Sequence, residues 1–428
     1  MQIHVIQPGQ SLWGISQAYG TSVQAIVNAN EIPNPSALVV GQALVIPIYG
    51  SFYWVQPGDT LYGIGKKFKV DYRELARING IPLQSYLSIG MRLYIPPKPK
   101  VNAEFNAYIE SFEETVSPEL EKAARDAAPQ LTYLAPFSFE VQRDGSLKEP
   151  PLNDYFNIAQ NNNVTLMMVV TNLEEGQFSN ELGRVILNDE NIQNKLLNNI
   201  VSAAKRLGYR DIHFDFEFLR PADREAYQKF LRKARTRFKA EGWLLSAALA
   251  PKTSATQKGE WYEAHDYKGI GAIVDFVVIM TYEWGYSGGP PMPVSPIGPV
   301  RKVLEYALTE MPGSKILMGQ NLYGYDWTLP YKPGGEYAKA LSPQAAIALA
   351  LKQGVAIQYD YKNQAPHFDY WDAQGKQHKV WFEDARSIQA KFDLMKELGL
   401  RGMSYWKLGL PFPQNWLLIR ENFNVVKQ

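Results

Sequence analysis

Residues 211–217 read Asp-Ile-His-Phe-Asp-Phe-Glu, with polar and apolar side chains in strict alternation. In a β-strand alternate side chains share one face, so the polar ones are expected to point the same way. A helix-like segment and a glycine precede this stretch, as for a strand in an α/β fold that is covered on both faces. Carboxylates are rarely buried there without a reason, and crowded carboxyl groups push each other's pKa values apart, as acid–base catalysis requires. The polar residues are Asp211, His213, Asp215 and Glu217.

The composition argues against several other kinds of chemistry. The 428 residues are 46% hydrophobic and carry a formal net charge of +1 without a strongly basic block, so nucleic acid is not expected as a partner. Cysteine is absent, and the five histidines show no metal-ligand spacing, so we expect no thiol chemistry, no metal and no cofactor. No long apolar run and no signal-peptide pattern is present, so we expect no membrane span and no signal peptide. We expect a monomer.

Short apolar strands alternate with helical stretches from about residue 101 onward. Such tandem units predict a parallel sheet with right-handed crossovers. Eight strands with polar groups at their ends favour the α/β class and a (β/α)₈ TIM barrel. A doubly wound open sheet is the alternative, disfavoured because no Gly-x-Gly-x-x-Gly follows a strand. The candidate strands are residues 104–109, 131–133, 165–170, 211–217, 244–248, 276–282, 315–320 and 402–406, with an insertion near 355–359 and 380–382.

Barrel active sites lie at the carboxyl ends of the strands, and polar residues stand at several of these ends. Aromatic side chains are frequent late in the chain, and flat rings suit the apolar faces of sugars. Two carboxylates, a Tyr hydroxyl, amides and a Trp therefore predict a pocket that cleaves sugars. Glu217 and Asp215 are the candidate catalytic acids, and Tyr282 supplies the hydroxyl. The predicted substrate-binding residues are Trp406, Gln320, Asn321, Asn172, Glu283, Trp284 and Tyr323.

The first hundred residues contain one internal repeat. Residues 5–13 correspond to 54–62, and residues 40–47 correspond to 89–96, at one constant offset. Each copy predicts a strand–helix–helix–strand (βααβ) module that resembles the LysM domain. The resemblance implies binding of glycans that contain N-acetylglucosamine, such as peptidoglycan or chitin, although a copy could serve only as a spacer. Two weak sites in tandem gain from effective concentration, which favours binding.

We expect four segments in the chain. A Pro-rich stretch after the second repeat predicts a semi-rigid linker. The expected boundaries are 1–48 for the first LysM repeat, 51–97 for the second, 98–102 for the linker and 103–428 for the barrel.

The barrel region resembles glycoside hydrolase family 18, the chitinase family. Residues 214–217 look like the end of its Asp-Gly-x-Asp-x-Asp-x-Glu motif, and residues 280–282 (Met-Thr-Tyr) like its Met-x-Tyr strand. With two LysM repeats, the chain resembles the spore cortex-lytic N-acetylglucosaminidases of Bacillus-type bacteria. The match is incomplete, because Arg210, Asp211 and His213 replace the motif's first Asp, its Gly and its middle Asp. We therefore expect activity with an altered pH profile.

The resemblance implies a retaining, substrate-assisted mechanism. Glu217 would protonate the scissile β-1,4 bond, and the substrate's own acetamido oxygen would attack in place of a second carboxylate. Asp215 and Tyr282 would hold the acetamido group, and Trp406 would form the floor under the sugar. We expect His213 to tune the site as a hydrogen-bonded partner of Asp215.

Three functions remain open at this point. The first is an N-acetylglucosaminidase that cleaves spore cortex peptidoglycan or its fragments during germination, placed at the cortex–coat boundary by its LysM modules and made in the mother cell without a signal peptide. The second is an inactive glycan-binding coat protein, and the third is a chitinase. The segment between Gln320 and Trp406 looks too short for the α+β subdomain of a long chitin cleft, which favours an open cleft.

Overall fold

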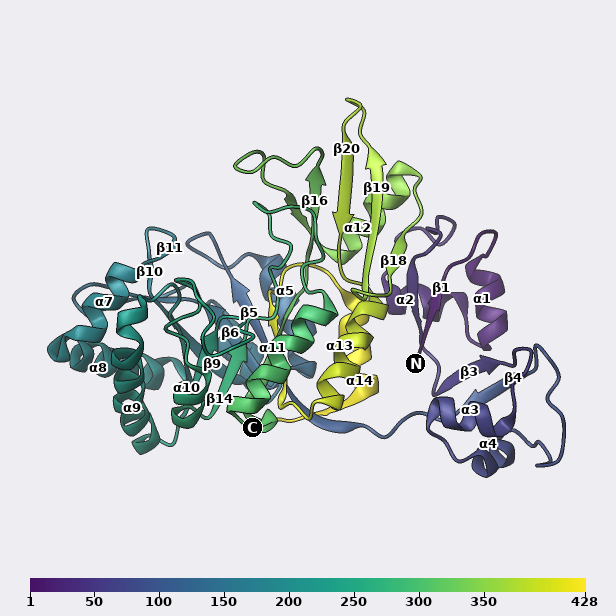
Figure 1. The fold of residues 1–428 in the computed structure, drawn as a ribbon, viewed down its shortest axis with the longest axis horizontal. Coiled ribbons are helices and arrows are strands. Elements are labelled where there is room, and N and C mark those ends of the chain that lie inside the picture. The colour runs from purple at the N-terminus through teal and green to yellow at the C-terminus, as the bar shows by residue number, and fades with distance from the viewer.

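The computed structural model describes residues 1–428, and most of them form a closed parallel barrel (Figure 1). Strand β12 pairs in parallel with both β9 and β13, which closes the ring. The predicted TIM barrel is confirmed, and the open sheet is excluded. The barrel strands are β5 (Val101–Glu110), β6 (Tyr133–Phe137), β9 (Thr165–Thr171), β12 (Asp211–Asp215), β13 (Leu244–Leu249), β14 (Phe276–Ile279), β15 (Ile316–Asn321) and β21 (Gly402–Trp406).

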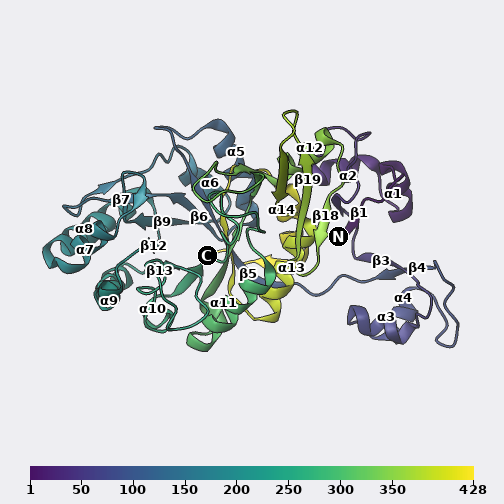
Figure 2. The ribbon, with the colours of Figure 1, turned by 45° about the horizontal axis from the view of Figure 1, so that its top comes forward.

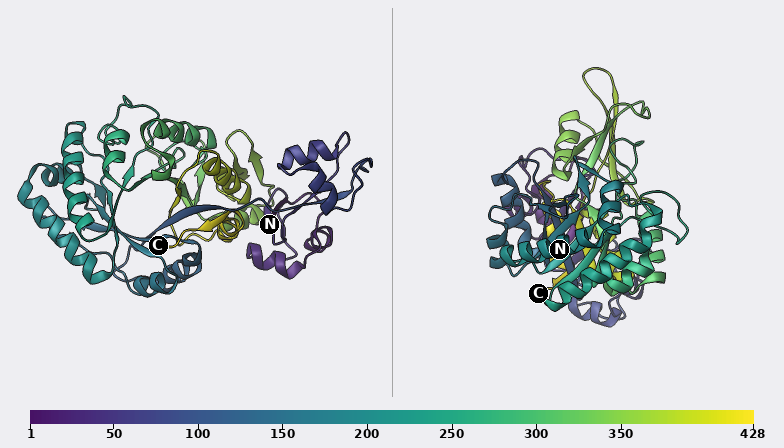
Figure 3. Two further views of the ribbon diagram at one scale, coloured as in Figure 1. Left: turned by 90° about the horizontal axis from the view of Figure 1, so that it is seen from below. Right: turned by 90° about the vertical axis from the view of Figure 1, so that its left-hand side faces the viewer.

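Helices surround this barrel, as the left panel of Figure 3 shows. The strands bury their outward side chains under the helices: Phe214 packs against Phe230 and Phe238 of α9. None of the helices combines the length and the apolar composition that a membrane span requires. The helices are α5 (Pro118–Ala127), α6 (Tyr155–Asn161), α7 (Asn180–Asn188), α8 (Glu190–Leu207), α9 (Arg224–Ala240), α10 (Tyr267–Ile273), α11 (Ile297–Glu310), α13 (Ala385–Glu397) and α14 (Pro413–Asn422), with short 3₁₀ turns η1 (Ala128–Gln130), η2 (Pro221–Asp223) and η3 (Gly313–Lys315).

Most strands differ from their predicted bounds at one end or both. Strand β6 begins at Tyr133, β12 ends at Asp215 and β14 ends at Ile279. Glu217 and Tyr282 therefore lie in the loops at the barrel mouth, because the chain turns away after the last paired residue. The remaining short strands are β7 (Phe139–Val141), β8 (Leu147–Lys148), β10 (Leu173–Glu174), β11 (Gln177–Phe178) and β22 (Phe423–Val425).

The insertion before the last barrel strand is an α+β subdomain, which stands above the barrel in Figure 1 and lies between the barrel and the first repeat in Figure 2. Its antiparallel sheet has the order β17-β16-β20-β19-β18. The prediction that this segment is too short was wrong, since antiparallel hairpins need only tight turns and fit a sheet into few residues. The elements are β16 (Gly324–Thr328), β17 (Lys339–Leu341), α12 (Pro343–Gln353), β18 (Gln358–Asp360), β19 (Ala365–Trp371) and β20 (Gln377–Trp381).

Both N-terminal repeats have the predicted βααβ order. Equivalent asparagines hold each copy together: Asn30 donates to the carbonyls of Ile26 and Val45, and Asn79 donates to those of Leu75 and Tyr94. The first copy contains β1 (Gln2–Val5), α1 (Leu12–Tyr19), α2 (Val23–Asn30) and β2 (Ala43–Ile46). The second contains β3 (Ser51–Trp54), α3 (Leu61–Phe68), α4 (Tyr72–Ile78) and β4 (Arg92–Ile95).

The two repeats contact the rest of the protein differently. In the first repeat, the amide of Ile357 donates to Val40 O at 2.9 Å, and Arg386 Nη2 donates to Gly41 O at 3.0 Å. Side chains of β2 join the same buried cluster as the barrel core. The second repeat hydrogen-bonds to the first through Gln2 and Phe52 and lies farther out in Figure 1. The first repeat therefore packs directly against the barrel and its insertion.

Gly41 and Gly90 occupy equivalent positions in the repeats and provide a matched test. Both have positive φ, +83° and +79°, so alanine should cost about 1–2 kcal/mol of backbone strain at either site. A Cβ on Gly41 would also lie 1.8 Å from Ile357 O, whereas one on Gly90 would meet nothing within 4 Å. We expect Gly41→Ala to lower the free energy of unfolding by a further ~1–3 kcal/mol. Urea denaturation checks this, and equal losses for the two variants would contradict the docked arrangement.

Candidate active site

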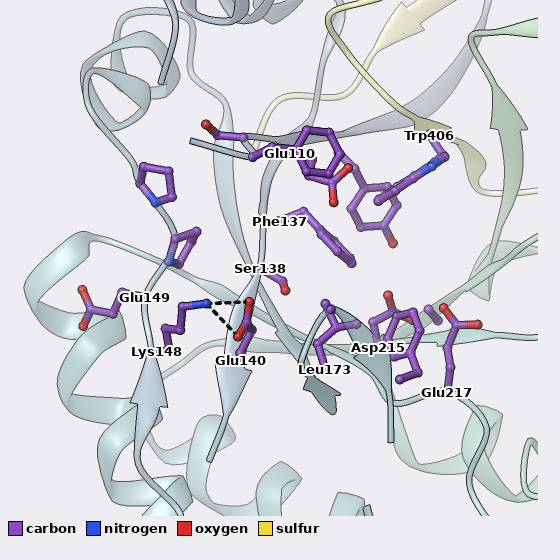
Figure 4. A pocket seen from close by; sticks show the side chains of 18 of the residues that line it. Glu110, Phe137, Ser138, Glu140, Lys148, Glu149, Leu173, Asp215, Glu217 and Trp406 are labelled. Atoms are coloured by element: carbon purple, nitrogen blue, oxygen red, sulfur yellow. Dashed lines mark hydrogen bonds and ion pairs between the residues drawn. The ribbon is translucent and has the colours of Figure 1, made fainter. Parts of the chain in front are cut away.

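A deep pocket opens at the carboxyl ends of the barrel strands (Figure 4). Its volume is about 960 Å³, large enough for several sugar units. Asp215 and Glu217 lie beside each other at one end, and the ion pair between Lys148 and Glu140 lies at the other. Aromatic side chains form much of the wall between them, namely Tyr108, Phe112, Phe137, Phe178, Trp261, Tyr282 and Trp406.

The two acids are positioned by the end of β12 and by the side chain of Asn172, the residue that follows β9. Asp215 is the last residue of β12, and Glu217 follows two residues later; they are 5% and 8% exposed. The Asn172 amide donates to Glu217 O and accepts from Glu217 N, both at 2.9 Å. Asn172 therefore positions the acid-bearing loop, and it does not line the pocket in which we predict it to bind substrate.

The electrostatics of the pair suit a proton donor next to an anion. Burial raises the pKa of Glu217 well above its usual range, and the charge of Asp215 raises it further. Burial raises the pKa of Asp215 to about 7. Its Oδ1 is buried without a hydrogen-bond partner and is free to receive one from a ligand. Near neutral pH this arrangement leaves the proton on Glu217, as a general acid requires.

Tyr282, in the loop after β14, and Trp406, the last residue of β21, complete the pocket. Burial and then the charges of Asp215 and Glu217 raise the pKa of Tyr282, so its hydroxyl stays protonated. The Trp406 ring packs edge-on against Phe137, with ring centroids 4.8 Å apart, and is held as a rigid wall. Both side chains line the same cavity as the acids.

The other predicted substrate contacts fall in three places. Glu283 borders the pocket, and the hydroxyls of Tyr323 and Tyr325 both donate to its Oε1. Tyr323 is thus buried behind Glu283 and does not line the pocket. Trp284 lines an adjoining cavity of about 360 Å³, whose wall shares Trp261, Tyr282 and Glu283 with the main pocket. Neither Tyr323 nor Trp284 lines the main pocket itself, and their contact with substrate stays a prediction.

Gln320 and Asn321 are fully buried and contact each other instead of the pocket. Gln320 Nε2 donates to Asn321 Oδ1 at 2.9 Å, and Ser295 Oγ donates to the same oxygen at 2.7 Å. Neither side chain lines the pocket in which we predict substrate contact. Strand β15 continues in register with β21 to Asn321, so both side chains stay inside the paired sheet. Gln320 Oε1 is buried there without a hydrogen-bond partner.

Neither ring nitrogen of His213 hydrogen-bonds to Asp215, contrary to the prediction. Its Nδ1 lies 2.8 Å from Ser246 Oγ, and its Nε2 lies 2.8 Å from Tyr108 Oη. Burial lowers the pKa of His213 to about 3, so the ring is neutral. The side chain points across the barrel interior, because residues of β12 alternate between the inner and outer faces.

Trp261 is the important residue that sequence reasoning missed. Its indole Nε1 donates to Glu217 Oε2, although it lies in the long loop after β13. Its ring stacks on Phe218, the residue after the acid, with centroids 6.1 Å apart. No strand-end position marks Trp261, so the only signal was an aromatic residue in a loop on the active-site side of the barrel.

Replacing Trp261 by phenylalanine should move the alkaline limb of the activity profile to higher pH. The indole hydrogen bond lowers the pKa of Glu217, so its loss leaves that pKa higher and keeps the acid protonated further into alkaline pH. We expect roughly a tenfold fall in kcat from poorer alignment of the acid. The pH dependence of kcat measures both effects. A limb that stays in place or moves to lower pH would contradict this contact.

The fold and the acid pair together define a glycoside hydrolase. The family model of Glycosyl hydrolases family 18 matches residues 105–410, and the LysM domain model matches residues 4–47 and 53–96. The chain belongs to family 18 of the glycosyl hydrolases and carries two LysM domains in front of the catalytic barrel.

Relatives resemble the chain over its whole length. It is 66% identical to the "Cortical fragment-lytic enzyme" of Bacillus subtilis (strain 168), with 100% of this chain and 99% of that protein covered. The crystal structure of the Bacillus megaterium QM B1551 spore cortex-lytic enzyme SleL matches with a TM-score of 0.93 at 59% identity, covering 100% and 99% of the two chains. The Bacillus cereus spore cortex-lytic enzyme SleL matches at 0.91 and 53%, covering 100% and 98%.

Proposed function

We propose that this protein is a retaining, substrate-assisted N-acetylglucosaminidase that cleaves β-1,4 bonds after N-acetylglucosamine in spore cortex peptidoglycan or its fragments during germination. The observation that carries the proposal is the buried pair of Asp215 and Glu217 at the pocket floor, with the pKa of Glu217 raised by burial and by Asp215. The names of the full-length relatives support the choice of substrate.

Each step of the reaction has a side chain in place. Glu217 protonates the glycosidic oxygen while the acetamido oxygen of the substrate attacks the anomeric carbon and forms a cyclic oxazolinium ion. Asp215 accepts the acetamido N–H through its unpartnered oxygen and stabilises the cation. The Tyr282 hydroxyl orients the acetamido group. Glu217 then takes a proton from water, which opens the ring with net retention.

The two LysM modules would hold the enzyme on peptidoglycan at the cortex–coat boundary of the spore. The loop of the second repeat exposes apolar side chains, whereas the equivalent loop of the first repeat is docked on the insertion subdomain. All groups that the mechanism uses come from one chain, so the proposal needs no oligomer. The exposed residues of the second repeat are Leu83, Tyr86 and Ile89.

A chitinase is the second candidate, and one observation favours it. The insertion forms a full α+β subdomain beside the pocket, the feature we expect of a long chitin cleft. Chitin oligosaccharides offered alongside cortex fragments would separate the two substrates, since a chitinase would prefer the homopolymer.

Product analysis tests the proposal. Mass spectrometry of cortex fragments after digestion should show new reducing N-acetylglucosamine ends, and early NMR spectra should show the β-anomer first. N-deacetylated fragments should resist cleavage, because they lack the internal nucleophile. Reducing muramic ends would overturn the choice of bond, and initial α-anomer would overturn retention. Binding without any product would favour the inactive glycan-binding protein.

A further inference from the structure

A continuous chain of hydrogen bonds crosses the barrel interior and ends in the active-site pocket. Both carboxyl oxygens of Asp211 lie 3.0 Å from Ser246 Oγ, which lies 2.8 Å from His213 Nδ1. His213 Nε2 lies 2.8 Å from Tyr108 Oη, and Tyr108 lines the pocket. Asp211, His213 and Ser246 have no exposed surface at all. The proposed reaction uses none of these four residues.

The fold brings the chain together from three strands. His213 of β12 is paired in register with Ser246 of β13, so the two side chains share the inner face. Asp211 is two residues before His213 and points to the same side. Tyr108 belongs to β5, which is separated from β12 by β6 and β9, so its bond to His213 spans the barrel. This series of hydrogen bonds therefore runs from one end of the barrel interior to the catalytic end.

Every member of this chain can both donate and accept, which allows two complete arrangements. When Asp211 carries a proton, it donates to Ser246, Ser246 donates to His213 Nδ1, and His213 Nε2 donates to Tyr108. The Tyr108 proton is then free for the pocket. When Asp211 is ionised, every bond reverses: Tyr108 donates to Nε2, and only an oxygen lone pair of Tyr108 faces the pocket.

We propose that these four residues form a positioning network in which the proton on Asp211 sets the direction of every hydrogen bond and so decides whether Tyr108 presents a proton or a lone pair to the pocket beside Asp215. The charge of Asp215 acts on Tyr108, so a Tyr108 hydroxyl that turns its proton toward the pocket favours the ionised form of Asp215. The network does not depend on the proposed function, whereas its effect on catalysis does.

The groups around Asp211 place the pH at which the hydrogen bonds reverse direction within a measurable range. Burial raises the pKa of Asp211 to about 8, with opposing contributions from Ser246, which lowers it, and from Asp275, which raises it. Arg401 lowers and Glu104 raises the same pKa. Near neutral pH the network is therefore uncharged, and the arrangement that donates to the pocket prevails.

The pocket end of the network faces further groups. Burial and the charges of Asp215 and Tyr282 raise the pKa of Tyr108, which keeps its proton in both arrangements. The Ser404 hydroxyl also faces Tyr108 and lowers that pKa, and it accepts a hydrogen bond from Asn106 at 2.8 Å. The neutral ring of His213 is required in both arrangements, and burial ensures it.

Nitrogen NMR of histidine-labelled protein tests the network without measuring activity. We expect Nδ1 of His213 to be the unprotonated nitrogen at neutral pH and Nε2 to be unprotonated at alkaline pH, over a titration from about pH 6 to pH 10. A His213→Asn variant assigns the signal among the five histidines. In Asp211→Asn, whose amide cannot ionise, one tautomer should persist at every pH. A tautomer that never changes in the wild type, or that still changes in this variant, overturns the network.

A double-mutant cycle tests the link to catalysis. Tyr108→Phe and Ser246→Ala should each lower kcat roughly tenfold with KM little changed, and the double variant should lose little more, because each breaks the same chain. Additive losses would show two separate structural effects and overturn the positioning role. If Ser246→Ala does not fold, the cycle is run with Asp211→Asn at alkaline pH. A tautomer switch in a protein that cleaves nothing would refute the proposed function and leave the network standing.

Discussion

Replacing Glu217 by glutamine is expected to lower kcat for glycan cleavage by about 10²–10⁴-fold, the contribution of a positioned general acid. Glutamine keeps the shape of the side chain and the hydrogen bond from Trp261 but cannot give up a proton to the glycosidic oxygen. KM should change little, because the pocket walls are untouched. Release of reducing ends from cortex fragments, measured across pH, checks the prediction.

A matched control separates this role from the general acidity of the pocket. Glu140 lines the same cavity but forms an ion pair with Lys148 at the far end, at 3.0 Å. Glu140→Gln should reduce kcat far less than Glu217→Gln. Comparable losses in the two variants would mean that the pocket needs negative charge and that Glu217 is not the acid. Full activity in Glu217→Gln would assign the proton donor elsewhere.

Replacing Asp215 by asparagine should lower kcat by roughly 10²–10³-fold, the usual loss when one preorganised electrostatic stabiliser is removed. The neutral amide cannot offset the positive charge that develops on the acetamido ring. The profile should also change shape: the charge of Asp215 raises the pKa of Glu217, so its removal lets Glu217 lose its proton at lower pH.

The alkaline limb of Asp215→Asn should therefore move to lower pH, opposite to the shift expected for Trp261→Phe. These opposite signs make the pair a sharp test, because a general loss of structure would not move the two limbs in different directions. Thermal unfolding of both variants serves as the control for folding. A limb that moves to higher pH in Asp215→Asn would contradict the electrostatic coupling of the two acids.

Local pattern in the chain was enough to predict the architecture and the centre of the site. Alternating strands and helices predicted the barrel, and the internal repeat predicted two βααβ modules. The spacing of Asp215 and Glu217 placed both acids at one barrel mouth, since neighbouring residues at a strand end cannot separate far. Such features depend on residues close together in sequence, and periodicity and turn residues encode them directly.

Only the tertiary structure determined which side chains contact each other across the barrel. Trp261 reaches Glu217 from a distant loop, and the side chain of Asn172, just after β9, bonds to the Glu217 backbone. His213 contacts Tyr108 across the interior instead of its neighbour Asp215. The docking of the first repeat on the insertion subdomain also joins segments about three hundred residues apart.

These contacts depend on how the ring closes and on which buried polar groups find partners there. Residue type and spacing predict which side chains of a strand point toward the barrel interior. They do not predict which strand or loop lies opposite those side chains. The sequence alone was therefore enough to predict the two acids and the two repeats. The residues that set the pKa of Glu217 and the orientation of His213 follow from packing in three dimensions.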